Sequence, residues 1–198
     1  MISVYIENII RMFDWGIITR MYGSSHNSVI GFLSSEWIKK SSDHSVLDGP
    51  PSPFIGKGRK GQKNADILLC KGDKPFIVVE VETTVAKYLE KIDSIAAYME
   101  NTKDYDGIGL GLLVMLNNTN GADKYKHNWH NAKEYAVSND IPIAFVSIEK
   151  SKADLGDTVL DQLKKRNEYY PWETSNIDYW IYGSDRKVVS GILWTDKR

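Results

Sequence analysis

Residues 65–84 read ADILLCKGDKPFIVVEVETT, an apolar hairpin pattern that carries carboxylates at Asp66, Glu80 and Glu82. The runs ADILLC and PFIVVEVE are rich in strand-forming residues, and the turn-forming KGDK between them predicts two antiparallel strands. Side chains two residues apart in a strand share a face, so Glu80 and Glu82 point the same way. Carboxylates buried without partners are costly, and we therefore expect a positive charge between them.

The register of this hairpin decides whether Asp66 joins the two glutamates. If Lys71 pairs with Pro75 across a three-residue loop, Asp66 lies opposite Glu80 on the same face. A two-residue loop that pairs Lys71 with Lys74 sends Asp66 to the other face. We expect the first register, with the three carboxylates grouped around a hard divalent cation such as Mg²⁺.

Composition predicts one globular domain over residues 1–198. The chain is 42% hydrophobic and 26% charged, with a net charge of -1, which leaves room for one substantial core. The lone cysteine, Cys70, excludes an intrachain disulfide and fits a reducing compartment. No apolar run is long enough to span a membrane and no signal-peptide pattern starts the chain, so we expect a cytoplasmic protein without a membrane partner.

Apolar spacing outside the hairpin predicts alternating helices and strands. Before the hairpin we expect helical structure over about 4–21, either continuous or interrupted at Gly16, then a helix from an Asn27 or Ser28 cap to about Lys40 and a long loop. After the hairpin we expect, in chain order, a helix capped by Thr83 or Thr84, a strand at 107–116, a helix at about 122–138, a strand at 141–149, a helix around 155–167, an aromatic segment at 169–180 and a hairpin turning at Ser184 and Asp185. This order predicts an α/β fold, in which a mixed sheet with a parallel crossover has helices on both faces.

The pattern of Asp66, thirteen intervening residues and then Glu80-Val81-Glu82, followed by a helix and a strand, resembles the PD-(D/E)XK nuclease superfamily. The resemblance covers about residues 28–148 in an αβββαβ-like order and implies the restriction-endonuclease-like fold. The third strand would come from the segment before Asp66 or from 107–116. The N-terminal helix and the C-terminal aromatic hairpin would be additions to this core.

The resemblance implies roles for individual residues. Asp66 matches the family's aspartate, although Ala65 replaces the usual proline, and Glu80 matches the acidic position of the motif. Glu82 stands where the family usually has lysine, as in the E-X-E variants of some restriction endonucleases. Some members supply this lysine from the following helix, where Lys91 is the first candidate and Lys87 the second. The metal ligands would be Asp66, Glu80, the Val81 carbonyl and, by its position on an earlier helix, Glu36.

A basic loop, GKGRKGQK, lies just before Asp66 and contains Lys57, Arg59, Lys60 and Lys63. Four cations among flexible glycines form a local positive patch in a nearly neutral chain. Either a solvated loop or a DNA contact accounts for this pattern, and its place beside the acidic cluster favours DNA. Lys87 would extend this DNA-binding surface.

These observations lead us to expect an endodeoxyribonuclease that hydrolyses double-stranded DNA. It would use Mg²⁺, with Mn²⁺ as a substitute, and Asp66, Glu80, Glu82 and Lys91 as catalytic residues. The type II restriction class is favoured, and a homodimer would cut both strands with two related sites. The alternatives are a structure-specific repair or recombination nuclease on the same fold and a catalytically inactive nucleic-acid-binding protein.

Overall fold

The computed structural model describes residues 2–18, 25–49, 64–84, 87–101, 109–118, 122–152 and 172–195. The basic loop at 57–63 and the expected helix at 155–167 lie outside these residues. The described elements are α1 (Ile2–Arg11), α2 (Trp15–Ile17), α3 (His26–Lys40), β1 (His44–Asp48), β2 (Ile67–Lys71), β3 (Lys74–Glu82), α4 (Tyr88–Asn101), β4 (Leu110–Asn118), α5 (Ala122–Ser138), β5 (Ile143–Lys152), β6 (Trp172–Tyr182) and β7 (Val188–Thr195).

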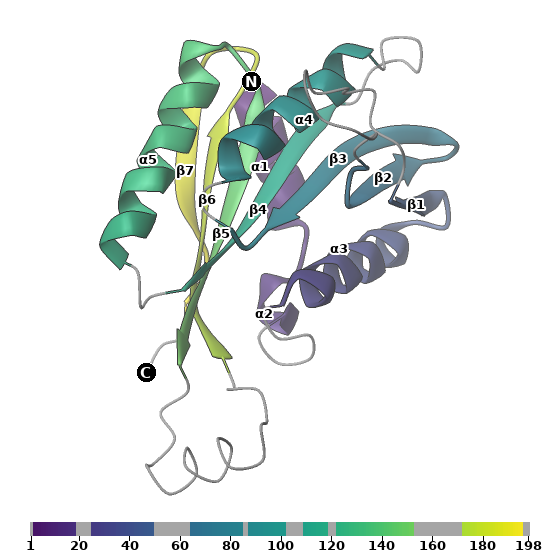
Figure 1. The fold of residues 1–198 in the computed structure, drawn as a ribbon. Coiled ribbons are helices and arrows are strands. Elements are labelled where there is room, and N and C mark those ends of the chain that lie inside the picture. Colours follow the sequence, from purple (N-terminus) through teal and green to yellow (C-terminus); the bar gives the residue numbers. More distant parts are fainter. Residues whose placement is uncertain are drawn as a thin grey trace, which may run out of the picture.

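The described strands form a seven-stranded sheet in which β1 to β7 lie side by side in chain order (Figure 1). β3, β4 and β5 run parallel, and every other neighbouring pair is antiparallel. The helix α4 joins β3 to β4, and α5 joins β4 to β5. This arrangement confirms the predicted α/β class, with a mixed sheet and a parallel crossover component.

Strand β1 corrects part of the predicted long loop before the hairpin. It pairs antiparallel with β2, from His44 opposite Lys71 to Asp48 opposite Ile67. Of the two segments that we considered for the third strand, the one before Asp66 therefore forms it. Its five residues are half-buried or exposed, because β1 lies at the edge of the sheet. A short edge strand rich in polar residues shows no apolar run from which it could be recognised.

Helices cover both faces of the sheet (Figure 1). The two crossover helices lie on one face, as expected when successive parallel strands are joined with the same handedness. There, Ile92 and Ile95 of α4 and Ala132 of α5 share a buried cluster with Val78 of β3. The helices α1, α2 and α3 contribute to a separate cluster that contains Val79.

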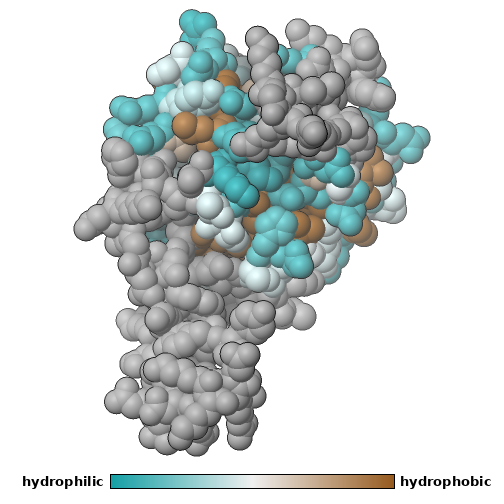
Figure 2. All heavy atoms as spheres, in the orientation of Figure 1, coloured by the Kyte–Doolittle hydropathy of each residue, from teal (hydrophilic) through white to brown (hydrophobic). Residues whose placement is uncertain are grey.

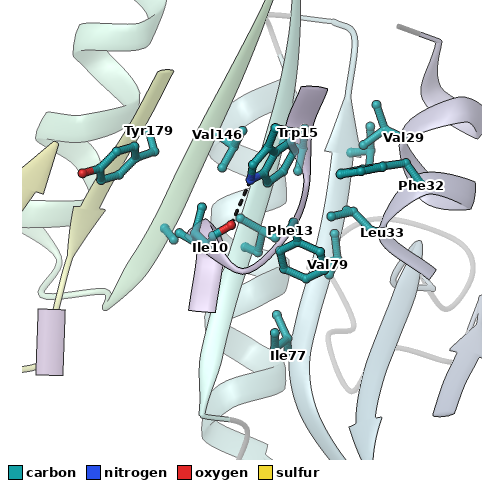
Figure 3. Packing of buried hydrophobic residues seen from close by; sticks show 14 of the residues in the cluster. Ile10, Phe13, Trp15, Val29, Phe32, Leu33, Ile77, Val79, Val146 and Tyr179 are labelled. Carbon is teal, nitrogen blue, oxygen red and sulfur yellow. Dashed lines mark hydrogen bonds between the residues drawn. The ribbon is translucent and has the colours of Figure 1, made fainter. Parts of the chain in front are cut away.

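Aromatic side chains pack together among aliphatic ones in the core on the α1–α3 face (Figure 3). The ring of Trp15 lies 5.2 Å from that of Phe32 and 5.9 Å from that of Phe13, measured between centroids. The buried indole nitrogen of Trp15 donates to the carbonyl oxygen of Ile10 at 2.9 Å, so the polar atom of this ring is hydrogen-bonded inside the core. The N-terminal helices are therefore part of the main core.

Hydrophilic side chains cover much of the described surface on the face turned to the viewer, and hydrophobic side chains show between them in small groups (Figure 2). In the part of the chain that the structure describes, no helix is long and apolar enough to cross a membrane.

The β2–β3 hairpin combines the two registers that the sequence allows. Lys71 pairs with Lys74 across a two-residue turn, in which Gly72 has a φ of 57°. The expected three-residue loop is therefore wrong. The register then shifts between Leu69 and Cys70, which leaves Phe76 as the extra residue of a β-bulge. Beyond the bulge Ile67 pairs with Val79, which is the register that we expect to bring Asp66 beside Glu80.

Helix α4 packs very closely on β4. Its buried stripe contains Tyr88, Ile92 and Ile95. Leu89, which helical spacing places in a second apolar stripe with Ile92, Ala96 and Met99, is 42% exposed. Both stripes have helical spacing, so periodicity does not distinguish them, and the large ring of Tyr88 takes the core position. A side chain at Gly111 of β4 would place its Cβ 2.2 Å from Cγ2 of Ile95. Glycine at this position therefore sets the distance between α4 and the sheet.

We expect Gly111→Ala to lower the free energy of unfolding by about 1–3 kcal/mol, because the new methyl group pushes Ile95 and α4 away from β4. Urea unfolding of the variant and the wild type measures this loss. Ser190→Ala, a change of similar size at an exposed strand position, is the control and should stay within about 0.5 kcal/mol of the wild type. Equal stability of the two variants would contradict the close packing.

Candidate functional site

The carboxyl end of β3 presents two glutamates to the face covered by α4. Val79 and Val81 point into the core on the α1–α3 face, so Glu80 and Glu82 between and beyond them point to the other face. Both glutamates are buried, and Glu80 is only 1% exposed. The predicted sharing of one face is confirmed.

Asp66 reaches the same place from the residue before β2. Its Oδ2 accepts a hydrogen bond of 2.7 Å from the backbone nitrogen of Val81, the residue next to Glu80. The bulge-corrected register makes this contact possible, because it aligns the start of β2 with the end of β3. The structure therefore brings Asp66 to Glu80, as the sequence predicts.

Lys91 of α4 supplies the positive charge that the hairpin demands. Its Nζ lies 2.5 Å from Oε2 of Glu80 and 3.8 Å from Oδ2 of Asp66. Lys91 lies at the end of the first turn of α4, and the close packing of this helix on β4 directs its side chain to the strand ends. The lysine expected from outside the strand thus lies at the acidic cluster.

Burial and charge act against each other at Glu80. Burial is the largest effect and raises the pKa of Glu80 to about 7. The charge of Asp66 also raises this pKa. The attraction and hydrogen bond of Lys91, and the hydrogen bond of 3.0 Å from the Ser94 hydroxyl, act to lower it. For Lys91, burial acts to lower the pKa, but attraction to Glu80, Asp66 and Glu82 outweighs it and raises the pKa above its usual value. Lys91 is therefore a firmly charged partner of a carboxyl group that protonates near neutrality.

Glu82 turns toward the backbone that follows it. Its Oε1 accepts hydrogen bonds from the backbone nitrogens of Thr83 and Thr84, at 2.8 and 2.7 Å. These bonds hold the chain at the point where it leaves β3. We expected Thr83 or Thr84 to cap the following helix, but α4 starts at Tyr88. The backbone of both threonines instead contacts Glu82 at the end of β3.

A pocket of about 240 Å³ opens at this cluster. Its lining residues are Asn64, Glu80, Glu82, Lys87, Glu90, Lys91 and Ser94. Three carboxylates thus face two lysines, and Asp66 adjoins them. An excess of carboxylates in a partly buried pocket favours the binding of a cation.

His26 is the residue that sequence reasoning missed. It is the first residue of α3, and its Nε2 lies 3.4 Å from Oδ2 of Asp66. The sequence contains no signal for this contact, because YGSSHNS looks like an ordinary loop and the approach of α3 to Asp66 is set by tertiary packing. The cluster therefore draws on three separated parts of the chain.

Glu36 does not join the cluster, which corrects its predicted part in metal binding. It lies ten residues after His26, or about 15 Å along α3. Its carboxylate is buried beside Lys39, at 3.1 Å, and accepts a hydrogen bond from the backbone nitrogen of Asp14. Lys87 lines the pocket, whereas Lys57, Arg59, Lys60 and Lys63 lie outside the described residues.

The described residues contain no group of three or more His, Cys, Asp or Glu side chains that could hold a metal ion as they stand. The Lys91 ammonium lies between the carboxylates of Asp66 and Glu80. Comparison of the chain with protein-family models, curated proteins and solved structures found no match. The assignment of function therefore depends on the geometry of this cluster.

We expect the metal-free protein to lose stability as the pH rises from about 4.5 to 7. In this range Glu80 keeps its proton in the folded protein and loses it in the unfolded chain. The contribution of Glu80 to the free energy of unfolding therefore falls by up to about 3 kcal/mol. Urea unfolding in the presence of a chelator measures this slope. Glu80→Gln cannot titrate and should flatten it, and an unchanged slope in this variant would contradict the assignment.

Proposed function

We propose that this protein is a Mg²⁺-dependent endodeoxyribonuclease of the PD-(D/E)XK superfamily, in the E-X-E variant of the motif. The observation that carries the proposal is the meeting of Asp66, Glu80 and Lys91. An aspartate and a glutamate on neighbouring strands share a lysine that arrives from the following helix. Lys91 thus replaces the motif lysine that Glu82 displaces.

The order of the described elements supports the same proposal. From α3 to β4 the chain runs helix, three strands, helix, strand, which is the αβββαβ order that the resemblance implies. The three strands form a meander, and the cluster lies where β2 begins and β3 ends. We therefore propose the restriction-endonuclease-like fold for this core, with the other elements as additions.

The donor atoms suit Mg²⁺ in kind. Asp66 and Glu80 offer carboxylate oxygens, the hard ligands that Mg²⁺ prefers, and the Val81 carbonyl belongs to the same strand end. When bound, the ion would coordinate a phosphate oxygen and lower the pKa of a water molecule. Lys91 would have to leave the space between the two carboxylates, and its long side chain allows this movement.

The remaining side chains have definite tasks in this proposal. The displaced Lys91 ammonium would counter the negative charge that develops on the phosphate oxygens during attack. Glu82 would accept a proton from the attacking water. Lys87, exposed at the rim of the pocket, would hold the DNA backbone together with the basic loop.

We further propose that the enzyme is a type II restriction endonuclease acting in the cytoplasm as a homodimer. Cleavage of two antiparallel strands at a symmetric site is simplest with two related active sites. A repair or recombination nuclease would use the same chemistry on branched or nicked DNA. The contact between Lys91 and both carboxylates also favours a second candidate, an inactive DNA-binding protein in which the lysine permanently replaces the metal.

We expect the wild type to cut plasmid DNA into discrete fragments only when Mg²⁺ is present. Glu80→Gln should lower the single-turnover rate by about 10²–10³-fold, because a metal ligand is lost. Glu36→Gln is the matched control, since Glu36 is another buried glutamate beside a lysine. An equal loss in both variants would contradict the proposed site.

Cleavage restricted to branched or nicked substrates would instead identify the repair class. Metal-independent binding of DNA without cleavage would identify the inactive protein.

We expect Lys91→Met to separate metal binding from catalysis. Removal of the ammonium frees Asp66 and Glu80, so Mn²⁺ affinity should be kept or increased, whereas cleavage should fall by about 10²-fold or more. Calorimetric titration with Mn²⁺ and single-turnover assays measure the two effects. Lys39→Met, which removes a lysine paired with Glu36, should change neither. Full activity of Lys91→Met would exclude Lys91 as the catalytic lysine.

A further inference from the structure

One stripe of α4 contacts both chain segments that carry the acidic cluster. Lys91, Ser94 and Tyr98 lie at spacings of three and four residues, which place them on one side of a helix. Lys91 and Ser94 contact Glu80. Tyr98 contacts the segment that leads into β2, because its hydroxyl accepts a hydrogen bond of 3.3 Å from the backbone nitrogen of Ala65.

The Ala65 amide needs this partner. Ala65 is buried, at 1% exposure, and it precedes the regular ladder of β2, which starts at Ile67. A buried backbone N–H without a partner costs about 1–3 kcal/mol. The Tyr98 hydroxyl satisfies this group at the residue just before Asp66.

We infer that Tyr98 is a positioning residue, which holds the Ala65–Asp66 backbone so that the Asp66 carboxylate lies beside Glu80. The Asp66 carboxylate accepts a hydrogen bond from the Val81 amide at 2.7 Å, and the Asp66 carbonyl oxygen accepts one from the Gly49 amide at 3.0 Å. Tyr98 and Gly49 thus hold the backbone at Ala65 and Asp66, and Val81 holds the Asp66 side chain. The part of this inference that concerns metal binding rests on the function proposed above.

Tyr98→Phe removes only the hydroxyl and tests the inference. Tyr135→Phe is the matched control, because the Tyr135 hydroxyl also bonds to α4, donating to Oδ1 of Asp93 at 2.7 Å, but makes this contact away from the cluster. In metal-free protein, Tyr98→Phe should speed hydrogen exchange of the Val81 amide about tenfold. The amides of Ile77 and Val79 in the same strand serve as internal references for any global loss of stability.

The metal-dependent readouts follow from the same loss of position. Tyr98→Phe should raise the Mn²⁺ dissociation constant about 10- to 100-fold. It should lower kcat while KM for DNA stays unchanged, because the substrate contacts are elsewhere. Tyr135→Phe should leave both parameters as in the wild type.

Unchanged Val81 exchange in Tyr98→Phe, or an equal change in Tyr135→Phe, would overturn the inference. So would uniform acceleration at Ile77, Val79 and Val81, because it would show only a general loss of stability. A wild type that neither binds Mn²⁺ nor cuts DNA would defeat the proposed function alone. In that case selective acceleration at Val81 would still establish that Tyr98 positions Asp66.

Discussion

The buried charge of Glu80 is the constraint around which this structure is arranged. A glutamate at 1% exposure in an inner strand requires a counter-charge, and Lys91 provides it at 2.5 Å. That distance is reached only if α4 lies very close to the sheet. Gly111 permits such an approach, because any side chain there would collide with Ile95. The packing of the crossover helix and the charge state of the strand end are thus parts of one arrangement.

Most of the fold is predictable because its strongest signals are local. The run of apolar residues in β4, the spacing in α5 and the Gly-Asp turn of the hairpin each determine their element without knowledge of the rest. β1 could not be predicted, because it is short, polar and at the edge of the sheet. Its strand conformation depends on pairing with β2 and not on a pattern in its own residues. The sequence also leaves the buried stripe of α4 undetermined, because two overlapping apolar patterns with helical spacing fit this helix.

The candidate site likewise contains some residues that the sequence predicts and others that only tertiary packing places there. Asp66, Glu80 and Lys91 follow from strand alternation, hairpin register and the need for a cation, all of which can be argued from the sequence. His26 and Glu36 lie on one helix, and only the packing of α3 decides that the first reaches Asp66 and the second does not. No local pattern contains that information. The contact of Tyr98 with Ala65 is likewise a product of tertiary packing.

Because of the bulge at Phe76, the length of the turn does not decide which face of the sheet Asp66 occupies. A homologue with one residue more in the turn and none at position 76 would present Asp66 and Glu80 in the same way. Loss of Phe76 alone would also keep these pairs, because a two-residue turn and an unbroken ladder still pair Leu69 with Ile77 and Ile67 with Val79. A change that instead draws Phe76 into the ladder opposite Leu69 would shift every later pair by one residue and move Asp66 to the face of the sheet opposite Glu80. Loss of the bulge without loss of its extra residue is thus a route by which a descendant could keep this fold and lose the site.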